Sequence, residues 1–375
     1  MRVLITGGGT AGHVNPALAI ADAIMTYEKD SVVEYVGTEK GLEGRLVHKR
    51  GMKLHPIEVY GLRRSLSPYN VKALAKALSA RKRCKEILRE FRPDVVVGTG
   101  GYVCWPLISA AASMKIPTVL HESNAELGFA IKTLQKKTDL ILVNFEGTKA
   151  SLKGAKNRVL RVGMPVNKDF YAEGKSNADK AKNAISDGEE FKILSFGGSL
   201  GARAVNLSVL ALMKAVIKDH PNVKIKHSCG ARELDIIRKI FEDEGLDRYP
   251  NIVLTDYIYD MPKEMKAADL VISRSGASTL AELAAAGKAS ILIPSPNVTG
   301  DQQRKNAALL KGANAAIVIE DALAVESLPK TVEALIAKEG RQTLRTLEKN
   351  VKTFAVKDCE KTIYGAIREL IDSQK

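Results

Sequence analysis

The chain has 375 residues, of which 45% are hydrophobic and 27% are charged, values that are ordinary for a globular protein. This length exceeds the usual size of a single hydrophobic core and predicts two domains. The net charge of +14 favours an anionic partner, such as a nucleotide, a nucleic acid or an acidic membrane surface.

The cysteines and histidines do not predict a metal site. The four cysteines (Cys84, Cys104, Cys229 and Cys359) form no CxxC pair, and we expect free thiols in a reducing cytosol. The histidines lack HxxxH and HExxH spacing, so we expect neither a metal nor a cofactor. The first apolar run is too short for a signal peptide, and no run approaches the roughly 20 apolar residues of a membrane span. Any membrane contact is therefore expected to be peripheral.

Apolar runs of strand length alternate with amphipathic helical patterns through the first half of the chain. The expected strands are Val3–Thr6, Val32–Val36, Lys53–Ile57, Val95–Val97, Thr118–Leu120 and Leu140–Val143. The expected helices are Ala17–Tyr27, Val71–Glu90, Trp105–Met114 and Phe129–Lys136. This alternation predicts an α/β domain with a doubly wound parallel sheet.

The alternation stops near Gly163 and is followed by a polar stretch from Asp169 to Glu190. It then restarts, and long helical patterns run from about Ala322 to Ile371. The second set of expected strands is Ile193–Ser195, Val223–His227, Ile252–Thr255, Leu270–Ser273, Ser290–Ile293 and Ala315–Ile319. We expect one domain to comprise residues 1–163 with a C-terminal helix at about 350–375, and the other to comprise residues 164–349.

A glycine-rich turn, Gly7–His13, follows the first strand and precedes a helix. Glycine lets the backbone approach a phosphate closely, and the helix N-terminus offers free N–H groups and a positive dipole end. Gly7, Gly9 and Gly12 also satisfy GxGxxG, so a nicotinamide-binding domain is an alternative. Its acidic ribose ligand would be Glu39, which is further along the chain than usual. A tight turn without a ligand is the third interpretation.

His13 opens the first helix directly after these glycines. A neutral imidazole can accept a proton from an attacking hydroxyl, and a helix N-terminus favours the neutral ring. A residue that only caps the helix is the alternative interpretation.

Two further motifs follow the next strands of the first half. Gly98–Tyr102 is a second glycine turn before a helix, and together with the first turn it could bind a diphosphate. His121–Asn124 lies at the carboxyl end of a strand, where Asn124 could bridge sugar hydroxyls. Packing glycines and a helix cap are the respective alternatives.

The second half repeats the first glycine motif in Gly197–Arg203. The strand ending at Ser273 then runs through a small-residue turn into a helix, which places Ser278 and Thr279 where phosphate oxygens could bind. Glu282 could bind a ribose diol there, or could form a capping box with Thr279. Asp301–Gln303 opens a later helix, where amides could bind sugar hydroxyls.

Together these motifs, in this order and at this spacing, resemble the MurG family of N-acetylglucosaminyltransferases over nearly the whole chain. The residues that carry the resemblance are Gly8–His13, Gly100–Tyr102, His121, Glu122, Asn124, Gly198–Arg203, Ser273–Ala277, Glu282 and Asp301–Gln303.

The resemblance implies a GT-B fold, in which two Rossmann-like domains face each other across an interdomain cleft. It implies an inverting, metal-independent transfer of GlcNAc from UDP-GlcNAc to the 4-hydroxyl of lipid I, undecaprenyl-pyrophosphoryl-MurNAc-pentapeptide. The product is lipid II, used in peptidoglycan synthesis, cell shape and cell division. The enzyme would lie peripherally on the cytoplasmic side of the cell membrane, on an anionic leaflet. Its expected partners include other cell-wall synthesis proteins and no nucleic acid. A UDP-GlcNAc epimerase of the same fold, a nicotinamide-dependent oxidoreductase and a non-catalytic nucleotide-sugar sensor are the alternatives.

The resemblance also implies roles for individual residues. On the donor side these are Ser199 for the diphosphate, Ile258 for the uracil, Ala277, Ser278, Thr279 and Leu280 for the donor, Glu282 for the ribose, and Gln302 and Gln303 for the sugar. On the acceptor side these are Thr10, Ala11, Gly12 and Tyr102 for the lipid diphosphate, Asn124 for the GlcNAc, and His13, or else Glu122, as the catalytic base. The chain departs from the family at Ala11, where glycine is usual, and lacks the family's arginine after residue 165. Asn167 or Lys168 would take the place of that arginine, Lys168 as a point charge.

The segment from Gly61 to Arg92 carries ten Lys and Arg residues and two Glu residues. Leucines, including Leu62, Leu66, Leu74 and Leu78, lie among these cations. Apolar residues surrounded by cations can dock on an anionic leaflet, and a solvated basic helix face is the alternative.

Overall fold

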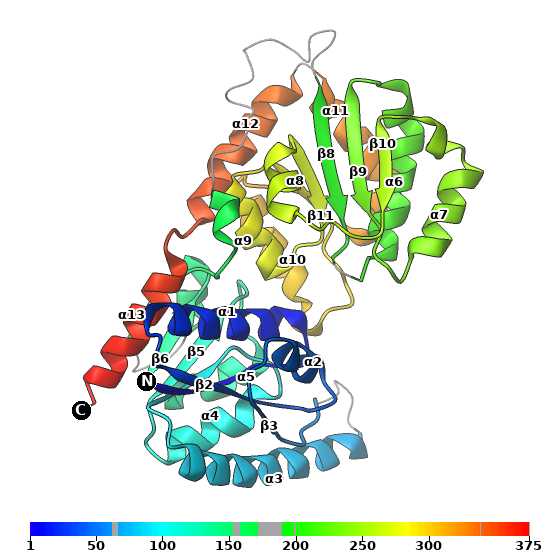
Figure 1. Ribbon diagram of the computed structural model, residues 1–375. Coiled ribbons are helices and arrows are strands. Elements are labelled where there is room, and N and C mark those ends of the chain that lie inside the picture. Colours follow the sequence, from blue (N-terminus) through cyan, green and yellow to red (C-terminus); the bar gives the residue numbers. More distant parts are fainter. Residues whose placement is uncertain (62–66, 153–157, 172–189, 199, 338, 375) are drawn as a thin grey trace. The chain divides into compact units, whose positions relative to one another are not determined.

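The computed structural model describes residues 1–61, 67–152, 158–171, 190–198, 200–337 and 339–374. The chain divides into two compact units, one of Met1–Pro165 with Val356–Lys375 and one of Val166–Ala355 (Figure 1). The boundaries expected from the sequence are residue 163 and about residue 349. Each unit has its own parallel sheet and its own hydrophobic core.

Within the described residues, the first unit contains a seven-stranded parallel sheet in the order β3-β2-β1-β4-β5-β6-β7. Its strands are β1 (Arg2–Thr6), β2 (Val32–Gly37), β3 (Leu54–Pro56), β4 (Val95–Gly98), β5 (Thr118–Glu122), β6 (Leu140–Val143) and β7 (Arg158–Arg161). The central strands are apolar along their whole length because helices cover both faces of the sheet.

Helices cover the two faces of this sheet and enclose two hydrophobic clusters. One face carries α1 (Ala11–Tyr27), α2 (Leu42–Lys49) and α13 (Cys359–Asp372). The other carries α3 (Pro68–Phe91), α4 (Cys104–Ser113) and α5 (Phe129–Leu134) (Figure 1). Short 3₁₀ turns η1 (Gln135–Lys137) and η2 (Glu146–Ser151) complete the described part of the unit.

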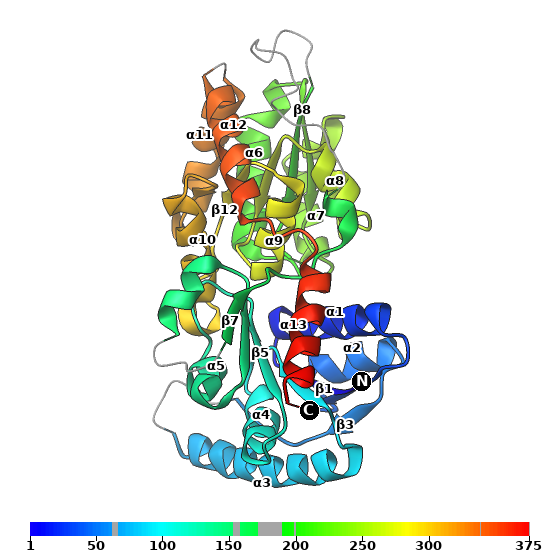
Figure 2. The same ribbon diagram turned by 90° about the vertical axis from the view of Figure 1, so that its left-hand side faces the viewer.

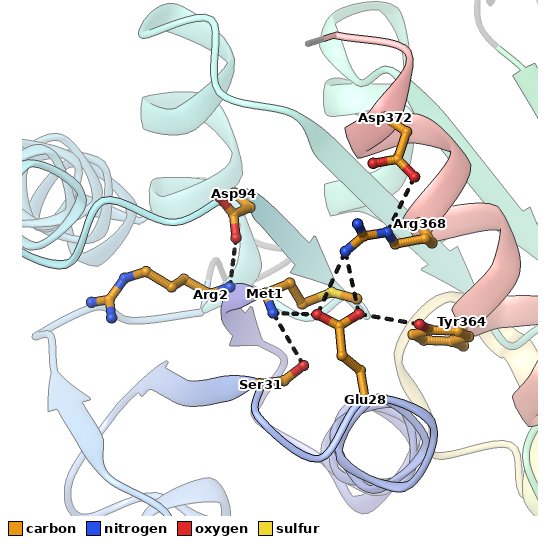
Figure 3. Close-up of polar contacts among 8 residues, drawn as sticks. All are labelled: Met1, Arg2, Glu28, Ser31, Asp94, Tyr364, Arg368 and Asp372. Carbon is orange, nitrogen blue, oxygen red and sulfur yellow. Dashed lines mark hydrogen bonds and ion pairs between the residues drawn. The ribbon is translucent and has the colours of Figure 1, made fainter.

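The C-terminal helix α13 is bound to α1 by polar contacts as well as by packing (Figure 3). Glu28, which ends α1, accepts a hydrogen bond of 3.1 Å from the Tyr364 hydroxyl and pairs with Arg368 at 3.3 Å. Arg368 also pairs with Asp372 in the next turn at 3.1 Å. The last helix of the chain therefore belongs to the first unit.

The second unit contains, within the described residues, a six-stranded parallel sheet in the order β10-β9-β8-β11-β12-β13. Its strands are β8 (Phe191–Phe196), β9 (Val223–Ser228), β10 (Ile252–Thr255), β11 (Leu270–Ser273), β12 (Ser290–Leu292) and β13 (Ile317–Val318).

Because the strands of the second sheet are parallel, their connections cross its faces, and helices cover both faces. One face carries α6 (Arg203–Ala215), α7 (Leu234–Asp243) and α11 (Ala324–Ile336), which share a single hydrophobic cluster with the sheet. The other carries α8 (Met261–Ala267), α9 (Ala277–Ala286) and α10 (Gln302–Gly312) (Figure 2). Helix α12 (Gly340–Val351) packs against α11, and its Leu344 and Leu347 belong to the same hydrophobic cluster. The 3₁₀ turns of this unit are η3 (Lys168–Tyr171), η4 (Ile217–Asp219), η5 (Leu246–Arg248), η6 (Thr299–Asp301), η7 (Asp321–Leu323) and η8 (Lys352–Phe354).

The strand order reverses between β1 and β4 in the first sheet and between β8 and β11 in the second. In open α/β sheets, ligands bind at the carboxyl ends of the strands beside such a switch point. The glycine turns predicted from the sequence follow β1, β4 and β8, and the predicted small-residue turn leads from β11 into α9. Topology alone thus brings the motifs of each unit together in pairs.

The prediction of two doubly wound parallel sheets is confirmed. The elements missed within the described residues include the edge strand β7, in which two apolar residues lie between two arginines, and the short helices α2, α7 and α8, of which α2 contains Gly44. The long helical pattern at the end of the chain is divided among α11, α12 and α13.

Candidate active site

The two glycine turns of the first unit pack directly against each other. The N–H of Gly8 donates a hydrogen bond of 3.3 Å to the carbonyl of Gly100. Gly9, Gly100 and Gly101 have positive φ angles of 83°, 106° and 77°, which favour glycine. A Cβ atom at Gly101 would lie 2.1 Å from the carbonyl oxygen of Gly8, so no other residue fits there.

The N-terminus of α1 is open to solvent beside these turns. Thr10 is the N-cap, but its side chain makes no capping bond, and Thr10, Ala11 and Gly12 are all exposed. The N–H groups of Ala11 and Gly12 have no partner among the described residues. Free N–H groups at the start of a 17-residue helix form a site for an anion such as a phosphate.

The imidazole of His13 is held in one orientation against the second glycine turn. Its Nδ1 lies 3.1 Å from the carbonyl oxygen of Thr99, which can only accept, so Nδ1 carries the proton. The Thr99 hydroxyl donates in return to the His13 carbonyl at 2.6 Å. Burial lowers the pKa of His13, with a smaller opposing effect of the Thr99 hydrogen bond. The ring is therefore neutral at physiological pH and has a free lone pair on Nε2, as a general base requires.

Glu122 ends β5 with its carboxylate buried. One oxygen accepts hydrogen bonds of 3.0 Å from the N–H and the side-chain amide of Asn124, and the other accepts one of 2.7 Å from the N–H of Gly128. Burial raises the pKa of Glu122, and these hydrogen bonds oppose the rise. Both oxygens are thus engaged in orienting the loop that carries Asn124, which favours a positioning role and leaves His13 as the proposed base.

Two further side chains shape this end of the first sheet. Tyr102 is 38% exposed, and its ring lies over Gly9, where a Cβ atom would approach it to 2.8 Å. His121 is buried and donates through Nε2 to the carbonyl of Gly163 at 2.9 Å, and burial lowers its pKa to about 4. Tyr102 covers the first glycine turn, whereas His121 is structural.

The glycine turn of the second unit packs against the end of β9. A Cβ atom at Gly201 would lie 2.0 Å from the carbonyl oxygen of Cys229, and Gly198 and Gly201 have φ angles of 96° and 78°. Ser199, predicted to contact the donor diphosphate, lies outside the described residues. The turn leads into α6, which begins at Arg203.

A buried polar network lies beneath this turn and was not foreseen from the sequence. His227 contacts the Ser195 hydroxyl through Nδ1 and the Asn206 side-chain oxygen through Nε2, both at 3.1 Å. The Asn206 amide donates to the carbonyl of Cys229 at 3.0 Å. Burial lowers the pKa of His227 to about 4, so a neutral ring joins β8, β9 and the first turn of α6.

The N-terminus of α9 lies at the switch point of the second sheet. Gly276 is its N-cap, so the capping box proposed for Thr279 and Glu282 is wrong: the helix begins before Thr279. The N–H groups of Ala277, Ser278 and Thr279 have no partner among the described residues and can bind an anion. Leu280 differs, because its side chain is buried and its N–H donates to Gly276 at 3.0 Å; we leave it out of the proposed site.

Glu282 lies in the second turn of α9 and is partly buried. Burial raises its pKa to about 7, and no described residue donates a hydrogen bond to it. A carboxylate in this environment is stabilised by hydroxyl donors from a ligand.

The start of α10 is joined to the start of α9. The Ser275 hydroxyl donates to the Gln303 carbonyl at 2.8 Å, and the Gln303 side-chain oxygen accepts from the N–H of Ser295 at 2.8 Å. The side-chain oxygen of Gln302 is buried without a hydrogen-bond partner among the described residues. Gln302 and Gln303 therefore lie beside the open N-terminus of α9, and Gln302 has an unsatisfied acceptor.

The remaining predicted donor residues lie at the edges of this group. Ile258 follows β10, with a buried side chain and a backbone that makes no hydrogen bond to any described residue. Asn167 is exposed and accepts from the N–H of Asp169 at 2.9 Å, which opens the turn η3. Lys168 is exposed on η3, which packs against α8 and α9.

Two classes of site are not observed in the described part of the chain. There, no group of three or more His, Cys, Asp or Glu side chains is arranged to hold a metal ion. No helix among the same residues is long and apolar enough to cross a bilayer.

Two parallel α/β units, each with a glycine turn and an open helix N-terminus at its switch point, are typical of glycosyltransferases that use nucleotide sugars. Residues 3–143 match the glycosyltransferase family 28 N-terminal domain, and residues 192–363 match the family 28 C-terminal domain. This chain is therefore a glycosyltransferase of family 28.

Similar proteins specify the family further. A protein of Listeria monocytogenes named UDP-N-acetylglucosamine–N-acetylmuramyl-(pentapeptide) pyrophosphoryl-undecaprenol N-acetylglucosamine transferase is 38% identical over 99% of this chain and 100% of its own length. The crystal structure of Acinetobacter baumannii MurG superposes with a TM-score of 0.80 at 28% identity, over 98% of this chain and 99% of that one. The chain belongs to the MurG family. UDP-GlcNAc 2-epimerase from Neisseria meningitidis shares the fold, with a TM-score of 0.65 at 15% identity over 98% of this chain and 100% of that one.

Proposed function

We propose that this enzyme transfers GlcNAc from UDP-GlcNAc to the 4-hydroxyl of undecaprenyl-pyrophosphoryl-MurNAc-pentapeptide, giving lipid II. The names of its full-length relatives support this substrate pair. The observation that carries the proposal is His13, a neutral histidine with a free Nε2 beside the open N-terminus of α1. A proton acceptor next to a site for an anion suits a hydroxyl acceptor that carries a pyrophosphate.

The second unit binds the donor in this proposal. The N–H groups of Ala277, Ser278 and Thr279, together with Ser199, bind the diphosphate, and Glu282 accepts hydrogen bonds from the ribose. Gln302 and Gln303 bind the sugar hydroxyls, and Ile258 contacts the uracil. Asn167 or Lys168 supplies the contact that arginine makes elsewhere in the family. These roles are supported by the Gln302 oxygen and the first N–H groups of α9, which have no hydrogen-bond partner among the described residues.

The first unit binds the acceptor and carries the base. Thr10, Ala11 and Gly12 with Tyr102 hold the lipid pyrophosphate, and Asn124, oriented by Glu122, contacts the GlcNAc. The acceptor oxygen forms a bond to the anomeric carbon while the bond from that carbon to the β-phosphate oxygen breaks. The proton passes to Nε2 of His13, and the electron pair of the broken bond remains on UDP. Helix N-termini and N–H groups stabilise the charge that develops there.

Label transfer distinguishes this reaction from that of an epimerase with the same fold. With UDP-GlcNAc labelled in the sugar and a short-chain lipid I analogue, we expect the label to enter the lipid fraction. An epimerase would leave all the label in a water-soluble nucleotide sugar, with or without the lipid. That second outcome would refute the proposed function.

We further propose that helix α3 docks the enzyme on the anionic cytoplasmic face of the cell membrane. Val71, Leu74 and Leu78 are 73%, 56% and 55% exposed and lie at helical spacing on α3. Lysines and arginines flank them in the sequence, and Leu78, Arg81 and Lys137 line a pocket of about 470 Å³ beside Trp105. The predicted contributions of Leu62 and Leu66 lie outside the described residues. Exposed leucines among cations suit an anionic lipid surface.

Leu74→Asp with Leu78→Asp is expected to weaken binding to phosphatidylglycerol vesicles about tenfold or more, because burying a leucine contributes roughly 1.5–3 kcal/mol. Vesicle sedimentation measures this, and salt should weaken the binding of the unmodified protein. Leu323→Asp is the matched control, since Leu323 is 55% exposed in the second unit. Equal vesicle binding by the α3 variant and the control would show that α3 is an ordinary solvated helix.

A further inference from the structure

A carboxylate with no counter-charge is buried beneath the first glycine turn. Glu43, in the first turn of α2, is 0% exposed. One oxygen accepts from the Thr38 hydroxyl at 2.5 Å and from the Thr38 N–H at 3.3 Å. The other accepts from the N–H of Gly9 at 3.3 Å. No lysine, arginine or histidine among the described residues pairs with it. Burying such a group is costly and calls for a reason.

Glycines make room for this carboxylate on three sides. A Cβ atom at Gly8 or Gly37 would lie 2.9 Å from a Glu43 side-chain atom, and one at Gly41 would lie 2.7 Å away. Gly8 belongs to the glycine turn, whereas Gly37 ends β2 and Gly41 precedes α2. The backbone is therefore shaped around this side chain, and the side chain lies directly against the turn.

The peptide between Gly8 and Gly9 connects Glu43 to the proposed base. Its N–H faces Glu43, and its carbonyl oxygen faces Gly101, where a Cβ atom would approach it to 2.1 Å. The same Cβ position is 3.2 Å from Cδ2 of the His13 ring. A rotation of this peptide would push its carbonyl away from Gly101 and release the packing on His13.

We propose that Glu43 is a positioning residue for catalysis. By holding the N–H of Gly9 inward, it fixes the Gly8 carbonyl against Gly101 and thereby fixes the His13 ring. Glu43 also accepts the hydrogen bond of the Gly9 N–H. The N–H groups of Ala11 and Gly12 are then the ones that donate hydrogen bonds to the pyrophosphate of the lipid. The inference rests on the proposed function, because it assigns the fixed ring to the base.

Two conservative variants, Glu43→Gln and Glu43→Asp, distinguish this positioning role from a purely local effect on helix α2. If Glu43 only placed a negative charge at the start of α2, aspartate would replace it and glutamine would not. If Glu43 acts through its reach, Glu43→Gln keeps the length. Its carbonyl can accept from Gly9, and its amide can donate to the Thr38 hydroxyl, which can also accept; only the bond of 3.3 Å from the Thr38 N–H is lost. Glu43→Asp keeps the charge but is one methylene too short to contact both Thr38 and Gly9.

The test compares steady-state kinetics of the two variants with UDP-GlcNAc and a lipid I analogue. We expect Glu43→Gln to stay close to the unmodified enzyme and Glu43→Asp to lose about 10- to 100-fold in kcat, as small displacements of reacting groups do. The KM for UDP-GlcNAc should change little, because all the residues proposed to bind the donor except Asn124 lie in the second unit. The acid limb of the pH–rate profile should move towards the ordinary histidine pKa in Glu43→Asp, because a displaced ring is less buried.

Glu34→Gln is the matched control. Glu34 is a partly buried carboxylate on β2 that contacts His55 at 2.5 Å and Lys53 at 3.3 Å. This variant is expected to change thermal stability without changing kcat or the pH profile. Equal kcat for both Glu43 variants, or a loss only in Glu43→Gln, would overturn the inference while leaving the proposed function intact. If the unmodified enzyme transferred no sugar, the proposed function itself would fail.

Discussion

Replacing His13 with alanine is expected to lower kcat by roughly 10²- to 10⁴-fold, the usual contribution of a general base. The Nδ1 proton of His13 is donated to the Thr99 carbonyl at 3.1 Å, so the substitution removes the only lone pair that this ring offers to an acceptor hydroxyl. UDP binding should be nearly unchanged, because the proposed donor site lies in the other unit. Turnover and calorimetric UDP affinity, measured on the same preparation, separate the two effects.

His48→Ala is the control for this variant. His48 is exposed in the same unit, where it contacts Glu39 at 3.0 Å, and its replacement should leave turnover unchanged. If His13→Ala turned over at the rate of the unmodified enzyme, His13 could not be the base. Glu122 would then be the next candidate to test.

The pH dependence of the unmodified enzyme gives a second test of the same role. The base must be neutral, and the neutral form of His13 prevails above its pKa. Because burial lowers that pKa, kcat at saturating donor should persist as the pH falls through 6.5 and should be lost only at a lower pH. The pH–rate profile of the residual activity of His13→Ala should lack this loss at low pH.

Replacing Glu282 with alanine is expected to raise the dissociation constant for UDP-GlcNAc roughly 10- to 100-fold. Hydrogen bonds to a charged group contribute about 1.5–3 kcal/mol, and two ribose hydroxyls would donate to this carboxylate. The described residues provide it with no donor of their own. The effect should appear in donor binding, measured by calorimetry, more than in kcat at saturating donor.

The raised pKa of Glu282 adds a pH signature to this prediction. Burial raises its pKa to about 7, and in the proposed site the ribose hydroxyls would bind the ionised form. Donor affinity should therefore increase as the pH rises through 7, with release of a proton on binding below that pH. Glu326→Gln is the control, because Glu326 is 76% exposed on α11. A Glu282→Ala protein with unchanged donor affinity and the same pH dependence would exclude Glu282 from the ribose site.

Much of the fold could be predicted from the sequence because strand and helix patterns alternate strongly in both halves. Glycine turns after β1, β4 and β8 could be placed for the same reason, since each follows a short apolar run. The short helix α2 could not, because it has only eight residues, one of them Gly44. Missing α2 also hid Glu43, although Gly41 and Gly44 around it marked a tightly packed segment.

The side-chain partners could not be predicted, because they are created by the strand order. His227 and Asn206 lie 21 residues apart and meet only because β9 is paired with β8. His13 meets Thr99 because β1 is paired with β4. The start of α9 was predicted wrongly for a local reason. Gly276 can cap a helix without a side chain, so the Thr279 hydroxyl does not have the capping role that the sequence suggested.

The most direct test of the whole account is the release of UDP by the purified enzyme, measured with UDP-GlcNAc in the presence and absence of a short-chain lipid I analogue. We expect release of UDP to depend on the acceptor, with one disaccharide-lipid formed for each UDP. Release at the same rate without the acceptor, or binding of UDP-GlcNAc without any release when the acceptor is present, would contradict a transferase with its base in one unit and its donor site in the other.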